Sequence, residues 1–176
     1  MEIFKKKKTV IFLSIMIVIV VCLFVFANTF VANILSGNVS FPDEYVGKTL
    51  TMEDGEKFVI LRRLKVSLKN DGIDGGAVFK VRFKFKSLEF GTNKKLSMIP
   101  TPFLMGMKGF REKFWTFNEN TGYFQGIYHW DSKRFAESYP DSFIYGLMTK
   151  RAEKETLSYE ILSDTELSEY INKLLD

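Results

Sequence analysis

Histidine and cysteine are almost absent from this chain of 176 residues, which contains one of each. A zinc finger, an all-His metal site, a thioredoxin-type Cys pair and an internal disulfide all need more ligands or a second thiol, so the sequence excludes them. A Gly-rich phosphate loop, a G-x-S-x-G turn and an HExxH run are also missing. Nucleotide hydrolysis, α/β-hydrolase chemistry and zinc proteolysis therefore have no support, and we expect neither a metal nor a cofactor.

Positive charge is scarce once the N-terminus is set aside. The net charge is +4, of which the four lysines at positions 5–8, less Glu2, supply +3 and leave +1 for all other residues. A nucleic-acid-binding domain carries a cationic footprint on its folded part. Nucleic acid is therefore not an expected partner.

Aromatic residues are plentiful by contrast, with 18 Phe, 7 Tyr and 2 Trp. The chain is 46% apolar and 26% charged, as folded proteins are, and its length suits one domain with an appendage. The aromatic side chains therefore have to be placed in a core or in a pocket.

A long apolar run follows the basic N-terminus of residues 1–8. Residues 9–27 have Ser14 as their only polar interruption, and nineteen helical residues cross a hydrocarbon core of about 30 Å. We interpret this run as a transmembrane helix in contact with membrane lipid. The alternative is a signal peptide cleaved after Ala27, although its apolar part is normally shorter.

The distribution of lysines predicts the orientation of this helix. Four lysines precede the run and none follows it until Lys48, which puts the N-terminus in the cytoplasm and the rest of the chain outside. We therefore expect a single-pass protein of the cell membrane, or a secreted one if the signal is cleaved. Residues 28–47 are expected to be a tether, and residues 48–176 a soluble domain.

Two β-rich runs open that domain. Residues 48–52 and 57–68 flank an Asp54-Gly55 pair, which is typical of a β-hairpin. Residues 70–76 follow as a loop; its acids suggest calcium, but the ligand spacing and closing Glu of an EF-hand are missing, so a plain loop is favoured.

Residues 78–86 alternate strictly between apolar and basic side chains, which predicts a strand with one core face and one cationic face. A short helix is expected from Thr101 and Pro102 to Gly109. The apolar residues of the strand are Phe79, Val81, Phe83 and Phe85, and the basic ones are Lys80, Arg82, Lys84 and Lys86.

The remaining pattern completes an α+β domain. Residues 110–118 and 123–130 form a second predicted hairpin, Asp131 or Ser132 caps a helix that Pro140 kinks or splits, and residues 156–162 form a last strand. A capping box over residues 163–166 predicts a C-terminal helix. From residue 77 to residue 163 the order is βαββαβ, a ferredoxin-like fold whose helices cover one face of the sheet. The other face needs a second subunit, the N-terminal hairpin or a ligand as cover.

Short motifs in this core resemble the small monooxygenases of the dimeric α+β-barrel superfamily, over about residues 77–163. The motifs are Gly109-Phe110, Lys113-Phe114-Trp115-Thr116, Gly126-Ile127-Tyr128 and an Asp131 that opens a helix.

The resemblance implies a homodimer that closes a barrel from two sheets, with a pocket between sheet and helices in each subunit. Some members oxidise aromatic substrates without metal or flavin, using the substrate's own electrons to activate oxygen, and others only bind. The haem-degrading branch places a His on its second long helix and an Asn on its first strand. Residues 132–148 contain no His and residues 78–86 no Asn, so the sequence departs from that branch.

His129 and Asn118 are the candidate catalytic residues. His129 is the only side chain that titrates near neutrality without perturbation, and strand alternation puts it on one face with Tyr123 and Gln125. A structural His and an Asn that starts a turn are the alternatives.

The candidate substrate-binding residues are mostly aromatic and would wall a pocket for a flat ligand, or else simply fill the core. A cationic residue would receive a carboxylate or lipid headgroup, or else lie on a solvated face. The set comprises Trp115, Phe117, Tyr123, Gln125, Tyr128, Trp130 and Arg82.

The function expected from the sequence is therefore that of a membrane-anchored, cofactor-independent monooxygenase-like homodimer acting on a small aromatic or quinol-like compound. The alternative is a non-catalytic module that binds an apolar ligand or mediates association at the membrane surface. A structural dimer without a ligand is a third, weaker reading.

Overall fold

The computed structural model describes residues 2–67, 76–86 and 89–175, which fall into two compact units divided after Asn38. The first unit is a single helix, α1 (Glu2–Leu35), which extends into the predicted tether. Among the residues that the structure describes, no helix is both long enough and apolar enough to cross a membrane. The transmembrane assignment of residues 9–27 is thus not confirmed.

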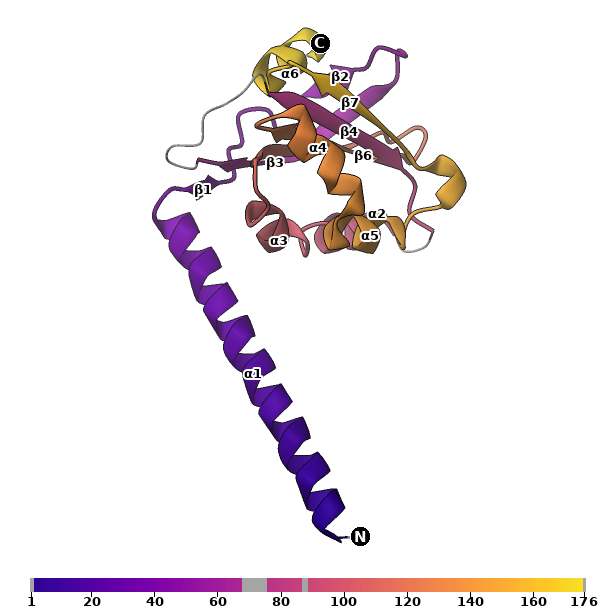
Figure 1. Ribbon diagram of the computed structural model, residues 1–176. Helices are drawn as coiled ribbons and strands as arrows, with labels where there is room; N and C mark the ends of the chain where they lie inside the picture. The colour runs from indigo at the N-terminus through magenta and orange to yellow at the C-terminus, as the bar shows by residue number, and fades with distance from the viewer. Residues whose placement is uncertain (1, 68–75, 87–88, 176) are drawn as a thin grey trace. The chain divides into compact units, whose positions relative to one another are not determined.

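The second unit is built on a seven-stranded sheet (Figure 1). Its core strands follow the order β5-β6-β4-β7 and pair antiparallel throughout, with helices between β4 and β5 and between β6 and β7. This confirms the predicted ferredoxin-like βαββαβ core. The elements are β1 (Val39–Ser40), β2 (Thr49–Thr51), β3 (Lys57–Val66), β4 (Ala77–Phe83), α2 (Phe90–Leu96), α3 (Thr101–Met105), β5 (Phe110–Phe117), β6 (Phe124–Trp130), α4 (Lys133–Ser138), η1 (Tyr139–Asp141), α5 (Phe143–Thr149), η2 (Lys154–Thr156), β7 (Ser158–Ser163) and α6 (Leu167–Leu174).

The predicted N-terminal hairpin is present and widens the sheet. β2 pairs with β3 in the register Leu50↔Phe58, and β3 continues along the edge of β5 with Val59 opposite Phe117. The connecting turn contains Gly55 at φ 81°, a conformation that glycine adopts without steric cost.

The sheet has a separate apolar core on each face. The helices α3, α4 and α5 pack on one face, whereas the hairpin and α6 lie on the other (Figure 1). The side chains that cover this second face include Leu50, Phe58 and Ile171. Of the three covers that the sequence left open for this second face, the N-terminal hairpin is the one observed. A homodimer that closed a barrel through this face would have to displace the chain's own hairpin and α6.

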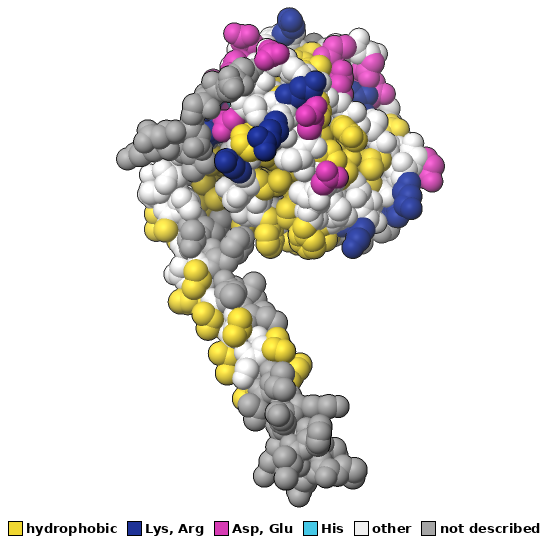
Figure 2. Space-filling model, viewed as in Figure 1, with side chains coloured by type: hydrophobic (Ala, Val, Ile, Leu, Met, Phe, Trp, Pro, Cys, Tyr) yellow, Lys and Arg dark blue, Asp and Glu magenta, His cyan; other side chains and the backbone are white. Residues whose placement is uncertain are grey.

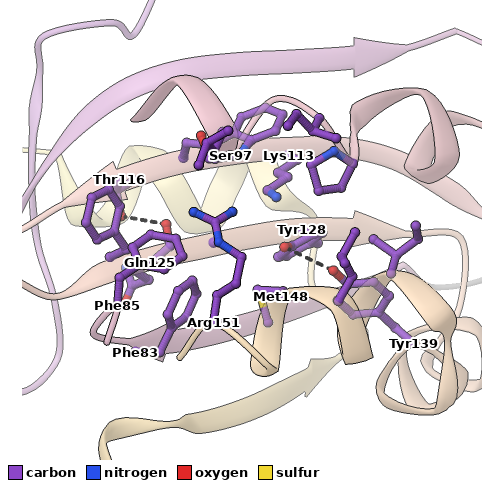
Figure 3. Close-up of a pocket in the computed structure, with 18 residues that line it drawn as sticks. Phe83, Phe85, Ser97, Lys113, Thr116, Gln125, Tyr128, Tyr139, Met148 and Arg151 are labelled. Carbon is purple, nitrogen blue, oxygen red and sulfur yellow. Dashed lines mark hydrogen bonds between the residues drawn. The ribbon is translucent and has the colours of Figure 1, made fainter. Parts of the chain in front are cut away.

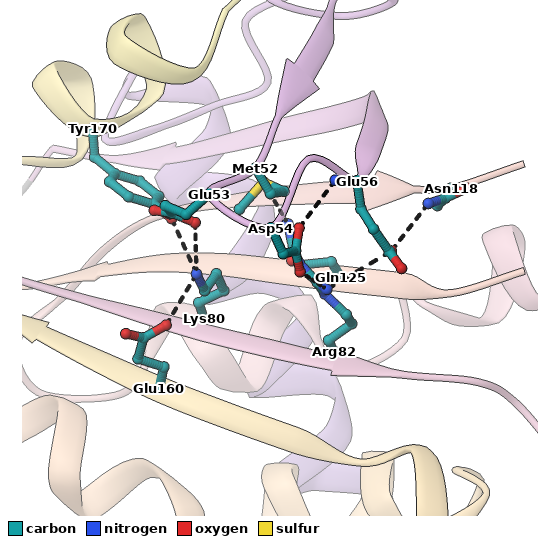
Figure 4. A network of polar contacts seen from close by, with 10 residues as sticks. All are labelled: Met52, Glu53, Asp54, Glu56, Lys80, Arg82, Asn118, Gln125, Glu160 and Tyr170. Carbon is teal, nitrogen blue, oxygen red and sulfur yellow. Dashed lines mark hydrogen bonds and ion pairs between the residues drawn. The ribbon is translucent and has the colours of Figure 1, made fainter. Parts of the chain in front are cut away.

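Ion pairs hold the tip of the hairpin on this face (Figure 4). Lys80 Nζ lies 3.1 Å from a carboxylate oxygen of Glu53 and 3.0 Å from one of Glu160. Arg82 Nη1 lies 2.6 Å from Asp54 Oδ2. The carboxylates, together with the hydroxyl of Tyr170, raise the pKa of Lys80 against the opposing effect of burial. A solvated face was one expectation for the basic residues of β4. In the structure, Lys80 and Arg82 instead form ion pairs with the acidic turn of the hairpin.

We expect the Arg82→Met variant to loosen this tip without unfolding the domain. The variant removes the partner of Asp54 and of Glu56, and such partly exposed pairs contribute about 1 kcal/mol. Amide hydrogen exchange at residues 53–56 should accelerate about fivefold to tenfold. Lys86→Met, at an exposed position beyond the end of β4, is the matched control and should leave this exchange unchanged. Equal protection in both variants would contradict the pairing.

Pro140 splits the expected long helix into α4, η1 and α5, as one of the two predicted outcomes, because its ring cannot continue an α-helix. Of the two predicted caps, Ser132 occupies the N-cap position of α4, without a side-chain hydrogen bond. The Asp131 carboxylate instead binds the Arg111 guanidinium, with Nη2 2.7 Å from Oδ2. Helix α2 was not predicted from the sequence.

The predicted capping box before α6 does not form. Glu166, rather than Ser163, is the N-cap residue, and its side chain makes no capping hydrogen bond. Asp164 lies at φ 50°. The helix is held instead by Leu167, Tyr170, Ile171 and Leu174, which are buried against the sheet.

Gly109, part of the motif that resembles monooxygenases, has a structural role. It lies at φ 77°, and a Cβ built on it would come within 2.3 Å of Phe135 Cδ2 and 3.0 Å of Phe135 Cβ. Only glycine fits this approach of α4 to the start of β5.

Candidate functional site

A cavity of about 250 Å³ lies between the helix-covered face of the sheet and helices α2 and α5 (Figure 3). Its walls are mainly aromatic and aliphatic, with a few polar groups, as is usual for small-molecule sites. The lining residues are Phe83, Phe85, Leu96, Ser97, Ile99, Pro100, Lys113, Trp115, Thr116, Phe124, Gln125, Gly126, Tyr128, Tyr139, Ile144, Leu147, Met148 and Arg151.

Gly126 leaves the space that Tyr128 uses in the floor of the cavity. Strand alternation points Phe124, position 126 and Tyr128 at the helices, so a side chain at 126 would enter this layer. A Cβ built there would come within 2.6 Å of Tyr128 Cε2 and 3.1 Å of its hydroxyl oxygen. Gly126, the first residue of the Gly126-Ile127-Tyr128 motif, therefore shapes the cavity.

Lys113 projects from β5 into the cavity (Figure 3). Its side chain is 6% exposed, and Nζ lies 4.2 Å from the ring centre of Trp115 and 4.5 Å from that of Tyr128. Within the described residues no carboxylate or hydrogen-bond acceptor reaches this amine. Burial alone lowers its pKa from 10.5 to about 7. The aromatic faces compensate part of the charge, but the ammonium lacks an anion.

Two tyrosine hydroxyls meet beside this amine. The hydroxyl oxygens of Tyr139 and Tyr128 are 3.2 Å apart in a hydrogen bond, and both side chains are buried. Burial raises the pKa of each phenol, so both stay protonated at neutral pH. Because their mutual hydrogen bond uses only one of the two protons, the other remains available to a ligand.

Arg151 supplies a second positive charge to the wall. Its Nη2 donates to Asn93 Oδ1 at 3.0 Å, and the guanidinium carbon lies 4.6 Å from the ring centre of Phe85. The residues that line the described cavity include no Asp or Glu. Two cations in an aromatic, water-poor space favour a ligand that carries negative charge.

The structure brings only three of the sequence-predicted binding residues to the cavity. Trp115 and Tyr128 line it, and so does Gln125, but the side-chain oxygen of Gln125 accepts from Arg82 Nε at 3.1 Å on the opposite face. Two others fill the core of the helix-covered face instead: Phe117 packs 4.3 Å from Phe90 between ring centres, and Trp130 packs 5.5 Å from Phe110.

The remaining predicted residues lie outside the cavity. Asn118 opens the turn after β5, where Oδ1 accepts the Asn120 and Thr121 amides and Nδ2 donates to Glu56. Tyr123 lies beneath Lys84, and Arg82 belongs to the ion pairs of the hairpin.

His129 lies on the sheet face opposite the cavity. Its Nε2 is buried without a hydrogen bond, 3.6 Å from Glu166 Oε2. Burial lowers its pKa, opposed by Glu166, Glu112 and Asp131. The catalytic roles assigned to His129 and Asn118 remain predictions, because nothing in the geometry brings these two side chains to the cavity.

Four features of the cavity were not predicted from the sequence: Lys113, Tyr139, Arg151 and the role of Gly126. A usable signal existed for Lys113, because in β5 it alternates with Trp115 and Phe117 on the apolar face. A charged side chain in an otherwise apolar series indicates a buried charge. No comparable signal marked Arg151, which follows α5 and reaches the cavity through the fold.

The iron-ligating histidine of the haem-degrading branch has no counterpart in this cavity. The only His of the chain is on the far face of the sheet, and among the residues that line the described cavity none offers an imidazole to iron. No step through haem is therefore assigned to this chain.

No protein-family model and no curated protein matches this sequence. Among solved structures, an uncharacterised ferredoxin-fold protein from Listeria monocytogenes related to antibiotic biosynthesis monooxygenases superposes with a TM-score of 0.50 at 17% identity, covering 79% of this chain and 89% of the other. A monooxygenase-like protein from Listeria innocua gives 0.48 at 16% identity over 66% and 68%. A heme-degrading enzyme from Listeria monocytogenes gives 0.47 at 15% identity over 70% and 95%. At 17% identity, the likeness to the first of these structures shows the fold alone, which is an α+β ferredoxin-like fold.

Proposed function

We propose that the chain binds a small aromatic compound with an acidic hydroxyl group in this cavity and oxidises it as a cofactor-independent monooxygenase. The observation that carries the proposal is the aromatic cavity that encloses Lys113 without a carboxylate partner. An aromatic anion would pack its ring against the apolar walls and pair its charge with the Lys113 ammonium. A neutral hydrocarbon would leave the ammonium unpaired.

The chemistry follows from the protonation states of the cavity. At neutral pH a large share of Lys113 is a free amine, because its pKa is about 7, so it can accept the proton of a phenol or quinol. The resulting phenolate is electron-rich and stays paired with the ammonium. In the reaction that the resemblance suggests, the phenolate and molecular oxygen react at the ring C–H para to the hydroxyl. One oxygen atom becomes the second carbonyl of a quinone, the other leaves as water, and the substrate supplies the electrons.

A second candidate is a module that binds such a compound without converting it. It is favoured by the position of His129 and Asn118, the two predicted catalytic side chains, outside the cavity. Both functions share the same ligand site, and turnover separates them.

The test combines binding with oxygen consumption on the full chain. Calorimetry with a panel of phenols and quinols should detect binding, and an oxygen electrode should then detect consumption with at least one bound compound. Binding without consumption would leave the binding module as the function. No binding by any member of the panel would contradict both candidates.

We predict that His129→Ala leaves the affinity for such a phenol unchanged within about twofold, because the imidazole lies on the other face of the sheet. Calorimetry of the variant checks this. A large loss of affinity, with the fold intact by circular dichroism, would show that the imidazole acts on the ligand after all.

The location of the chain is a separate proposal that rests on its sequence. We propose that residues 9–27 anchor it in the cell membrane with residues 48–176 outside, on the evidence of the lysines at positions 5–8 and the apolar run. Alkaline carbonate extraction should leave the full chain in the membrane pellet. Complete release would contradict an anchor, and a product that begins near residue 28 would indicate a cleaved signal.

A further inference from the structure

Exposed apolar side chains gather at the end of the second unit that carries α2, α3 and α5. Phe143 is 71% exposed, Ile99 58%, Phe103 44% and Phe90 39%. Figure 2 shows hydrophobic side chains collected along this end of the domain. We name these four residues the apolar rim.

The apolar rim is continuous with the mouth of the cavity. The rings of Phe103 and Phe143 lie 6.5 Å apart, which joins α3 to α5 across the surface. Ile99 belongs both to the rim and to the cavity wall, next to Pro100 and Leu96. An apolar molecule at the rim is therefore next to a residue of the cavity wall.

Basic side chains flank the rim on the same elements. Lys94 and Lys95 occupy the last turn of α2, and Lys150 follows α5. Residues 89–97 and 141–153 carry three acidic side chains and four basic ones, so positive charge is in excess there by one. The acidic residues are Glu89, Asp141 and Glu153, and the basic ones are Lys94, Lys95, Lys150 and Arg151. Aromatic and aliphatic side chains beside lysines are what anionic membrane surfaces bind. A second copy of the chain would bring the same lysines against one another.

We propose that the apolar rim docks on a lipid bilayer with anionic headgroups, so that the cavity opens toward the lipid. Phe143 and Phe103 enter the boundary between headgroups and acyl chains, and Lys94, Lys95 and Lys150 contact the phosphates. Docking itself does not depend on the proposed function. The consequence that an apolar ligand enters from the bilayer rests on that function.

The test places a polarity-sensitive fluorophore on the rim of the full chain. The single native cysteine is first replaced by Cys22→Ser, and Phe143→Cys then carries the label. The matched control is Val46→Cys, an exposed apolar position (41%) in a turn next to Tyr45, which packs on the opposite face of the sheet against Phe114. Both labelled chains are mixed with vesicles of phosphatidylcholine alone or with added phosphatidylglycerol, some containing nitroxide lipids.

With anionic vesicles, the label at position 143 should shift its emission to the blue and be quenched by nitroxide lipids, whereas the label at 46 should not. Lys94→Gln with Lys95→Gln should weaken the affinity for anionic vesicles about thirtyfold, because each of the two lysines near an anionic surface contributes about 1 kcal/mol. The control pair Lys65→Gln with Lys173→Gln, exposed on other elements, should leave it unchanged.

Four outcomes would overturn docking. Equal responses at positions 143 and 46 would show that the rim is not the contact surface. A blue shift at 143 without vesicles that grows with protein concentration would identify a second copy as the partner, and one independent of concentration would identify another part of the chain. No change in emission at position 143 under any condition would show that the rim does not bind anionic bilayers.

Discussion

Replacing Lys113 by Met should stabilise the folded chain by roughly 4 kcal/mol at pH 6, and this gain should shrink as the pH rises to 10. The reason is that the native state buries an ammonium group without an anionic partner, which lowers the pKa of Lys113 to about 7. Methionine has a similar length and shape and needs no counter-ion.

The direction of the pH dependence follows from proton counts. Below pH 7 the folded and unfolded chains both carry the proton on Lys113, so the full cost of the buried charge is present. Between pH 7 and 10.5 the unfolded chain holds more protons than the folded one, and the stability of the native sequence rises with pH. The difference between the native chain and Lys113→Met must therefore fall over this interval.

Urea denaturation of both chains at pH 6 and pH 10 measures this difference. Lys113→Arg is a sharp control, because guanidinium does not lose its proton in this range and should keep the chain destabilised at both pH values. Lys84→Met is the control for loss of a lysine over an aromatic ring outside the cavity. A constant difference between Lys113→Met and the native chain across this range would show that Lys113 titrates as an exposed lysine.

The second large effect is expected from Gly126→Ala. The new methyl group would lie 2.6 Å from Tyr128 Cε2, so the ring would have to move. It cannot move freely, because it packs 5.0 Å from Tyr139 and 5.8 Å from Phe79 between ring centres. Overpacking of this kind costs about 2 kcal/mol and narrows the cavity floor.

The Gly126→Ala variant should also bind its ligand about tenfold more weakly or worse, because one extra methylene group in a fitted pocket has an effect of this size. Gly91→Ala is the matched control: it lies on α2 with nothing within 4 Å of the new Cβ, and it should preserve both stability and binding. Calorimetry and urea denaturation of the two variants measure both quantities. Unchanged binding in Gly126→Ala would show that the ligand does not occupy this cavity.

The strands and their faces could be predicted from sequence because their patterns are local. The strand β4 has an alternating pattern, and the first hairpin has turn residues at Asp54-Gly55. Both signals, like those of the second hairpin, lie within a few consecutive residues. The helix ends were less predictable. The side chains of Asp131 and Ser163 favour capping locally, but Asp131 pairs with Arg111 from the neighbouring strand, and no short-range rule anticipates that partner.

The candidate site was harder to predict because it is assembled from distant segments. Trp115 and Tyr128 were identified because aromatic residues are conspicuous in a strand, whereas Tyr139 and Arg151 reach the cavity from a 3-10 turn and from the residues after α5. His129 drew attention by its chemistry alone, although one residue along the strand separates the cavity face from the opposite one. The turn at Asp54-Gly55 and the basic face of β4 were each predicted, but only the fold shows that the acidic residues of this turn pair with that face.

Absorption spectroscopy of a bound nitrophenol tests most directly whether Lys113 makes this cavity a site for an acidic aromatic compound. The phenolate and phenol forms of such a probe have different visible spectra, so the spectrum reports where the proton lies. At pH 6, where the free probe is mainly the phenol, the native chain should bind it as the phenolate beside a protonated Lys113, and Lys113→Met should not. A bound probe that keeps the phenol spectrum in the native chain, or an equal phenolate signal in Lys113→Met, would contradict the account.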